Sequence, residues 1–172
     1  MQTINNRDSG NKTLLWIAGG CLVVLACIIG AIVLGFGGLY WLGSQSPENV
    51  TVQVEIPSQA QVGDPFEFDI TVTNSGPESV QLFSTAISMN FLNGIIIDRT
   101  NPQFTETNQY DALGGGETFI NYYFSQSIAP GETLKVVFSG KAVSTGVFSG
   151  NMDVCINSDF NCITNVARTV IK

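Results

Sequence analysis

The sequence contains no histidine, and only 12% of its 172 residues are charged. Without histidine the chain cannot form a Ser-His or Cys-His catalytic pair, an HExxH zinc site or a His-ligated haem. Its 7 Lys and Arg residues are outnumbered by 14 Asp and Glu, which gives a formal net charge of −7. Because nucleic-acid phosphates attract clustered Lys and Arg, this balance argues against a nucleic-acid partner. The length allows one domain, or one domain and an appendage.

Charge is also missing from one continuous segment. No Asp, Glu, Lys or Arg occurs in the 35 residues between Lys12 and Glu48, and residues 14–42 are strongly apolar. As a helix these apolar residues would extend about 44 Å, whereas the hydrocarbon core of a bilayer is about 30 Å thick. We therefore expect a single transmembrane helix over residues 14–42, between a tail at 1–13 and a polar linker at 43–49.

Aromatic residues mark both ends of this segment: Trp16 near its start, and Tyr40 and Trp41 near its end. Amphipathic rings of this kind prefer the membrane–water interface. Two cationic side chains precede the segment, and the next one after it is Arg99. Because cytoplasmic flanks carry the excess of positive charge, we expect residues 1–13 in the cytoplasm and the C-terminal part outside the plasma membrane.

Two cleaved forms of this segment are the alternatives. A signal peptide has an apolar region of roughly 7–15 residues, which is about half the length present here. Residues 41–44 also lack the small-x-small pattern that precedes a cleavage site. Cys27 follows the sequence VLA, which weakly resembles a lipoprotein box, but the chain stays apolar through Leu34. The excess length favours an uncleaved anchor over both alternatives.

Small residues recur at four-residue steps along the predicted helix, with Ala26 and Gly30 on one face and Cys27, Ala31 and Gly35 on a neighbouring face. Such stripes let two helix backbones approach closely, which favours a homodimer through the membrane or pairing with another spanning helix. The alternative is composition alone, because glycine is frequent in spanning helices. Both interpretations stay open.

Beyond residue 49 the hydrophobic period changes from that of a helix to that of a strand. Apolar residues alternate with polar ones over residues 50–56 and again over 66–73, which is typical of strands with one buried face. No later segment shows a helical period. Further strands are expected at 80–91 (with a bulge), 95–97, 119–124, 134–143, 147–156 and 162–171. Seven or eight short strands separated by turn residues predict two packed antiparallel sheets, an all-β sandwich.

Two motifs in this region carry a resemblance to a known family. Residues 62–76 read VGDPFEFDITVTNSG, and residues 128–133 read IAPGET before an alternating strand. Both motifs resemble those of bacterial immunoglobulin-like domains of the CARDB and S-layer-associated type. The resemblance covers residues 50–172 and implies an extracytoplasmic immunoglobulin-like β-sandwich that serves as a spacer, adhesion or docking module. It implies no shared catalytic residues and no cofactor.

The four cysteines form two pairs of different character. Cys21 and Cys27 lie in the predicted membrane segment, where a thiol behaves as a small apolar group. Cys155 and Cys162 flank six residues between the last two predicted strands. Outside the cytoplasm, cysteines that face each other across a hairpin can form a disulfide, so we expect one here. A metal site would need two further ligands.

Oxygen-bearing side chains gather at the same hairpin, namely Asn151, Asp153, Asn157, Asp159 and Asn161. Calcium takes six to eight oxygen ligands, so these residues are candidates for a calcium site. Asn and Asp are also ordinary turn residues, and the sequence has no DxDxDG calcium loop. The turn interpretation is preferred, and we expect no resident metal.

Residues 99–116 have no alternating pattern and are expected to form an irregular loop. Long loops within compact domains are usually functional or disordered. We therefore expect this loop to contact a protein or envelope-polymer partner. Its candidate contact residues are Phe104, Tyr110, Gly114, Gly115 and Gly116.

One pattern could serve an enzyme, the close pair Ser139 and Lys141. A Ser-Lys nucleophile needs a buried lysine, whereas Lys141 is expected to point to solvent, so we expect no enzyme activity. The favoured function is a single-pass, membrane-anchored, non-catalytic binding or structural module of the cell envelope. The alternative is a pilin-like filament subunit with a hydrophobic N-terminal helix and a β-sandwich head.

Overall fold

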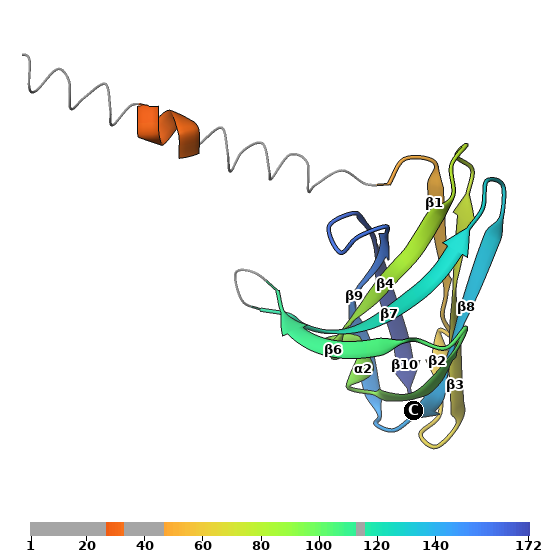
Figure 1. Cartoon of the computed structure of the whole chain (residues 1–172). Coiled ribbons are helices and arrows are strands. Elements are labelled where there is room, and N and C mark those ends of the chain that lie inside the picture. Colours follow the sequence, from red (N-terminus) through yellow and green to blue (C-terminus); the bar gives the residue numbers. More distant parts are fainter. Residues whose placement is uncertain (1–26, 33–46, 113–115) are drawn as a thin grey trace, which may run out of the picture. The chain divides into compact units, whose positions relative to one another are not determined.

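A computed structural model of the chain describes residues 27–32, 47–112 and 116–172 (Figure 1). The chain divides into two units, Met1–Ser44 and Gln45–Lys172. In the first unit the described residues, 27–32, are helical. Within the described ranges, no helix is both long enough and apolar enough to cross a membrane.

Most of the predicted transmembrane segment lies outside the described residues. This applies to the interface residues Trp16, Tyr40 and Trp41, and to Ala26 and Gly35 of the small-residue stripe. The other stripe residues lie in the helical segment, and they are Cys27, Gly30 and Ala31.

The second unit consists almost entirely of strands, because alternating apolar residues give most of these strands one face to bury. Its elements are β1 (Val50–Glu55), β2 (Gln59–Ala60), β3 (Pro65–Asn74), β4 (Val80–Ser88), α2 (Met89–Leu92), β5 (Ile95–Asn101), β6 (Glu106–Asp111), β7 (Thr118–Ile128), β8 (Thr133–Ala142), β9 (Gly146–Ile156) and β10 (Cys162–Ile171).

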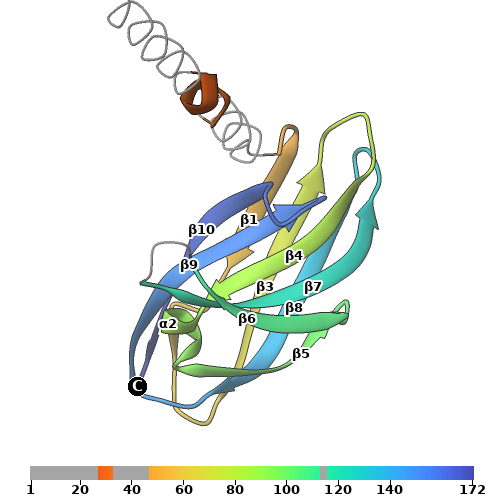
Figure 2. The same cartoon turned by 60° about the vertical axis from the view of Figure 1, so that its left-hand side comes forward.

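These strands form two sheets, with the orders β1-β3-β8-β5 and β2-β10-β9-β4-β7-β6. Figure 2 shows the two layers, with β10, β9, β4, β7 and β6 side by side in one of them. Neighbouring strands run antiparallel, apart from β2, which pairs in parallel with β10. The predicted all-β architecture of two sheets is therefore confirmed.

The strand order follows the immunoglobulin arrangement. β1, β3 and β8 take the places of strands A, B and E in one sheet, and β4, β9 and β10 take those of C, F and G in the other. Three strands lie between β4 and β8 in the chain: β5 takes the place of strand D beside β8, and β7 and β6 extend the second sheet beside β4. With β7 and β6 the second sheet has six strands, against four in the first.

The core between the sheets is centred on stacked aromatic rings. Phe138 of β8 stacks on Phe68 of β3, with ring centroids 4.8 Å apart. Tyr122 and Phe124 of β7 meet Phe138 edge-on, at 5.3 and 6.2 Å. Phe91 of α2 packs edge-on against Phe68 at 5.9 Å. Because these rings come from both sheets and from the helical turn, they join the two layers.

The strand expected over residues 80–91 is shorter in the structure, although its expected bulge is present. It ends at Ser88, whose hydroxyl accepts a hydrogen bond from the backbone N–H of Asn90 and caps the helical turn α2. This turn buries Phe91 in the core. No helix is expected from the sequence here, because a single turn is too short to show a helical period.

The prediction of an irregular loop over residues 99–116 is wrong. β5 continues to Asn101, and β6 pairs with β7 from Glu106 to Asp111. All six residues of β6 are exposed. An edge strand without a buried face is held by backbone hydrogen bonds, which leave no alternation of apolar and polar residues in the sequence.

Truncation of the central ring should weaken the fold. Phe138 is fully buried, so Phe138→Ala should lower the free energy of unfolding by about 3–5 kcal/mol. Phe160→Ala is the matched control, because Phe160 is 77% exposed, and it should change that free energy by less than about 0.5 kcal/mol. Urea titration of the full chain in detergent, followed by circular dichroism at the strand band, measures both. Equal losses would contradict the assignment of the core.

Alkaline pH should destabilise the sandwich through Tyr122. Burial raises the pKa of its phenol to about 12, whereas a tyrosine in an unfolded chain titrates near pH 10. The folded state therefore holds the proton more tightly, and this stabilisation is full below about pH 10 and is lost as the pH rises through about 12. Thermal unfolding from pH 8 to 12 should show a falling Tm above pH 10, and Tyr122→Phe should show a smaller fall. Identical pH profiles would refute this.

Candidate functional site

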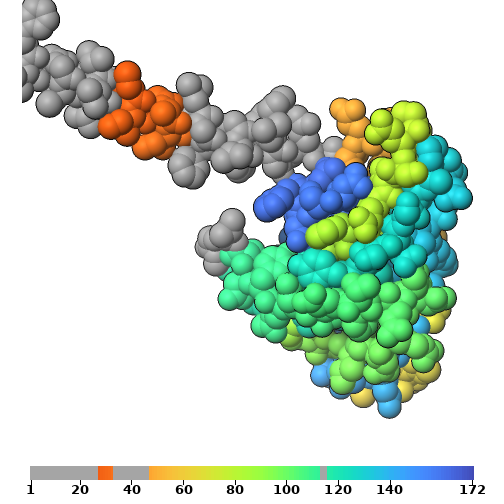
Figure 3. Space-filling view, in the orientation of Figure 1, coloured from red at the N-terminus to blue at the C-terminus, as the bar shows by residue number. Residues whose placement is uncertain are grey.

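The outer face of the six-stranded sheet carries a hollow of about 670 Å³. It is lined by residues of β6, β7 and β9, the segment between β6 and β7, and the turn between β9 and β10. Figure 3 shows this turn in blue beside the green and cyan surface of β6 and β7. Four of the lining side chains are aromatic, namely Tyr110, Phe119, Tyr123 and Phe160. Four are acidic, namely Asp111, Glu117, Asp153 and Asp159.

Strand alternation brings these residues to one face. On β7 Phe119, Asn121 and Tyr123 line the hollow, whereas Tyr122 and Phe124 between and after them point into the core. On β9 the same rule sends Asn151 and Asp153 outward, while Met152 and Val154 are buried in the core. The hollow thus lies on the outward side of the strands whose inward side builds the core.

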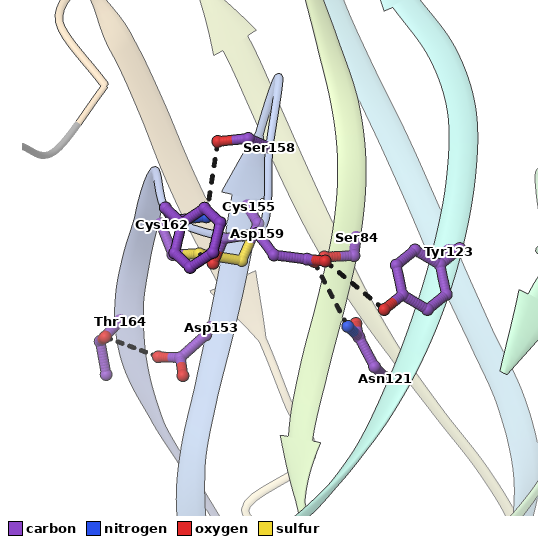
Figure 4. Close-up of a disulfide and its surroundings, with 10 residues drawn as sticks. Ser84, Asn121, Tyr123, Asp153, Cys155, Ser158, Asp159, Cys162 and Thr164 are labelled. Carbon is purple, nitrogen blue, oxygen red and sulfur yellow. Dashed lines mark hydrogen bonds between the residues drawn. A yellow bond between two sulfur atoms is a disulfide. The ribbon is translucent and has the colours of Figure 1, made fainter. Parts of the chain in front are cut away.

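Asp159 is the centre of the polar contacts (Figure 4). Its Oδ1 accepts hydrogen bonds from Ser84 Oγ at 2.8 Å and from Asn121 Nδ2 at 3.5 Å. Its Oδ2 accepts one from the Tyr123 hydroxyl at 3.5 Å, which in turn accepts one from Asn108 Nδ2 at 3.2 Å. The donors to Asp159 lie on β4 and β7, so this one carboxylate ties the β9–β10 turn to two strands of the sheet, and Tyr123 extends the network to β6.

The predicted disulfide between Cys155 and Cys162 is confirmed (Figure 4). The two residues face each other in the register of β9 and β10, with their Cα atoms 4.0 Å apart. The bond closes the six-residue turn that presents Asp159 and Phe160. It therefore fixes the position of two residues of the hollow.

The other three carboxylates of the hollow also accept hydrogen bonds from neutral groups. The pairs are Asp153 with the Thr164 hydroxyl (2.6 Å), Glu117 with the Asn151 amide (3.2 Å) and Asp111 with the Thr118 hydroxyl (2.7 Å). Among the described residues the single ion pair joins Lys135 to Asp69, at 2.7 Å, on the four-stranded sheet. The negative charge of the hollow is therefore not paired with any described cation.

Tyr110 is a tyrosine of the hollow whose pKa responds to burial and to this negative charge. Its ring stacks on Phe119, with centroids 5.6 Å apart. Burial first, and then the charges of Asp153 and Asp159, raise the pKa of the Tyr110 phenol above its ordinary value of 10.0. A further negative charge is disfavoured in this hollow, and a positive charge is favoured by the same field.

The five calcium candidates do not share a common hydrogen-bond partner among the described residues. Asp159 binds side chains of β4 and β7, and Asp153 binds Thr164. Asn157 turns the other way, and its side chain accepts a hydrogen bond from the backbone N–H of Gln81 at 2.8 Å. The remaining two candidates are Asn151, which contacts Glu117, and Asn161, whose Oδ1 is buried without a partner among the described residues. In the described part of the chain, no group of three His, Cys, Asp or Glu residues is arranged to hold a metal ion.

The structure places the candidate contact residues of the predicted partner loop at different locations. Tyr110 lines the hollow, as a residue of β6. Phe104 instead packs edge-on against Tyr122 at 5.5 Å, on the core side. Gly116 is exposed, with φ of +136°, and the other two glycines, Gly114 and Gly115, lie outside the described residues.

The Ser139 and Lys141 pair lies on β8, in the other sheet. Ser139 Oγ donates to Glu67 Oε2 at 3.1 Å, and Lys141 is exposed, as expected. Sequence reasoning missed Phe119, Asn121 and Tyr123 as site residues. The sequence pattern that could have identified them is their spacing of two residues, which places all three on one face of β7.

Removal of the disulfide should loosen the turn more than the sandwich. Replacing Cys155 and Cys162 by Ser should lower the free energy of unfolding by about 2 kcal/mol, as expected for a short closed loop. It should also speed hydrogen exchange of the backbone amides at 156–161, because the bond no longer closes the turn. Cys27→Ser is the control, since it leaves this disulfide intact. Unchanged exchange at 156–161 would show that the disulfide does not hold the turn.

No family model matches this sequence, and no curated protein matches it significantly. Among solved structures, a CARDB domain from Pyrococcus furiosus, solved in complex with di-metal ions, is 13% identical with a TM-score of 0.41, covering 74% of this chain and 92% of that one. The cupredoxin domain of amoB from Nitrosocaldus yellowstonii is 8% identical with a TM-score of 0.44, covering 74% of this chain and 90% of that one. The alkylpurine DNA glycosylase AlkC from Pseudomonas fluorescens is 10% identical with a TM-score of 0.44, covering 72% of this chain, which spans 30% of that enzyme. At these identities no ligand or activity carries over to this chain.

Proposed function

We propose that this chain is a non-catalytic binding module of the cell envelope, anchored in the plasma membrane by residues 14–42, with its sandwich outside the cytoplasm. The observation that carries the proposal is the hollow on the outer face of the six-stranded sheet, where four aromatic and four acidic side chains gather around the turn that holds Asp159. The volume of about 670 Å³ is that of a typical small-molecule or side-chain pocket.

The anchor is supported by the 35 residues without charge between Lys12 and Glu48. In the helical segment 27–32, the apolar side chains of Ile28, Ile29 and Ile32 are each more than half exposed. Exposed isoleucines on a helix favour contact with lipid, since an apolar surface in water is costly.

The location outside the cytoplasm is supported by the Cys155–Cys162 disulfide. Disulfides persist in oxidising compartments and are rare in the reducing cytosol. The proposed direction agrees with the cations Arg7 and Lys12, which precede the anchor and favour a cytoplasmic N-terminus.

Site-specific crosslinking tests the anchor and the binding face together. A photoreactive residue in place of Tyr110, in the hollow, should crosslink a partner in intact cells, and the product should sediment with membranes. The same residue in place of Gln53, exposed on β1 of the other sheet, is the matched control and should give no such product. Recovery of the full chain as a freely dissolved protein would refute the anchor. Equal crosslinking from both positions would refute the hollow as the binding face.

A further inference from the structure

The charge of the hollow points to the chemistry of its ligand. Its lining includes four carboxylates, Asp111, Glu117, Asp153 and Asp159, and no Lys or Arg among the residues that the structure describes. Each carboxylate accepts its hydrogen bonds from a hydroxyl or an amide, so its full charge remains. Four anionic groups around one hollow repel one another unless a cation lies between them.

Asn121 adds a second, independent observation. The residue is only 4% exposed and lines the hollow. Its Nδ2 is directed to Asp159, and its Oδ1 has no hydrogen-bond partner within residues 27–32, 47–112 and 116–172. Because a buried acceptor without a partner is costly, this oxygen favours a ligand that donates a hydrogen bond. Asn121 thus adds a buried, unpartnered acceptor beside the carboxylates of the hollow, within the part of the chain that the structure describes.

Aromatic rings supply the third part of the site. Phe160 is 77% exposed on the turn that the disulfide closes, and Tyr110 is 40% exposed on the facing edge strand. Packing of the core does not explain why either ring is exposed. Ring faces attract organic cations, and a planar guanidinium also stacks on them.

We propose that the hollow binds an organic cation whose charged head is an alkylammonium or guanidinium group. The head lies among the carboxylates of Asp153 and Asp159, donates a hydrogen bond to Asn121 Oδ1, and contacts the rings of Tyr110 and Phe160. This inference rests on the proposed function and names the ligand class of the same site. A neutral sugar fits less well, because its hydroxyls would leave all four carboxylate charges uncompensated.

Calorimetric titration of the full chain in detergent micelles tests the inference. The probes are agmatine, a free guanidinium compound, and a capped Gly-Arg-Gly peptide, which presents the same group as a protein side chain would. Binding of either probe should weaken at least tenfold in Asp159→Asn, and weaken with rising salt. Asp69→Asn is the matched control, since Asp69 lies on the other sheet, and it should change the Kd by less than twofold. The probe with the lower Kd identifies a free cation or a partner protein as the source.

Asp153→Asn is the second variant, for the case in which Asp159→Asn perturbs the turn, and it should also weaken binding. The inference is overturned if neither probe binds, if both variants leave the Kd unchanged, or if only calcium chloride or a methyl glycoside binds. These outcomes leave the proposed function standing as long as crosslinking from position 110 persists. Conversely, agmatine binding by a chain that is recovered as a freely dissolved protein would support the ligand class and refute the membrane anchor of the proposed function.

Discussion

The pleat of β7 assigns each of its side chains to one of two faces, and both the core and the hollow depend on that assignment. Inward, Tyr122 and Phe124 meet the ring of Phe138 from the opposite sheet. Outward, Asn121 and Tyr123 meet the carboxylate of Asp159. A shift of β7 by one residue would exchange the two faces, so the packing of the aromatic core also sets the register of the polar site.

The hollow combines elements that are remote in the sequence. β4 and β7 supply the hydrogen-bond donors to Asp159, and β6 supplies the ring of Tyr110. The turn closed by the disulfide supplies the carboxylate of Asp159 itself. Acidic groups in this arrangement are held by hydroxyls and amides rather than by lysines or arginines. The four carboxylates give the hollow a negative field before any ligand enters.

Much of the architecture is predictable because strand alternation is a local pattern. The strands over 147–156 and 162–171 and the Cys155–Cys162 disulfide follow from alternation and from the position of the cysteines at one turn. β6 and α2 are not predictable in this way. An exposed edge strand has no face to bury, and a four-residue helical turn has no period to detect.

By itself, the sequence determined the class of the fold, the disulfide, the long segment without charge and the acidic balance, because composition and period are properties of neighbouring residues. The tertiary structure alone decided which acidic and aromatic residues meet. Asp159 reaches Ser84 and Tyr123, which are 75 and 36 residues away, because the strand order places β9, β4 and β7 side by side. No local pattern encodes that order, since it results from how the two sheets pack around a shared core.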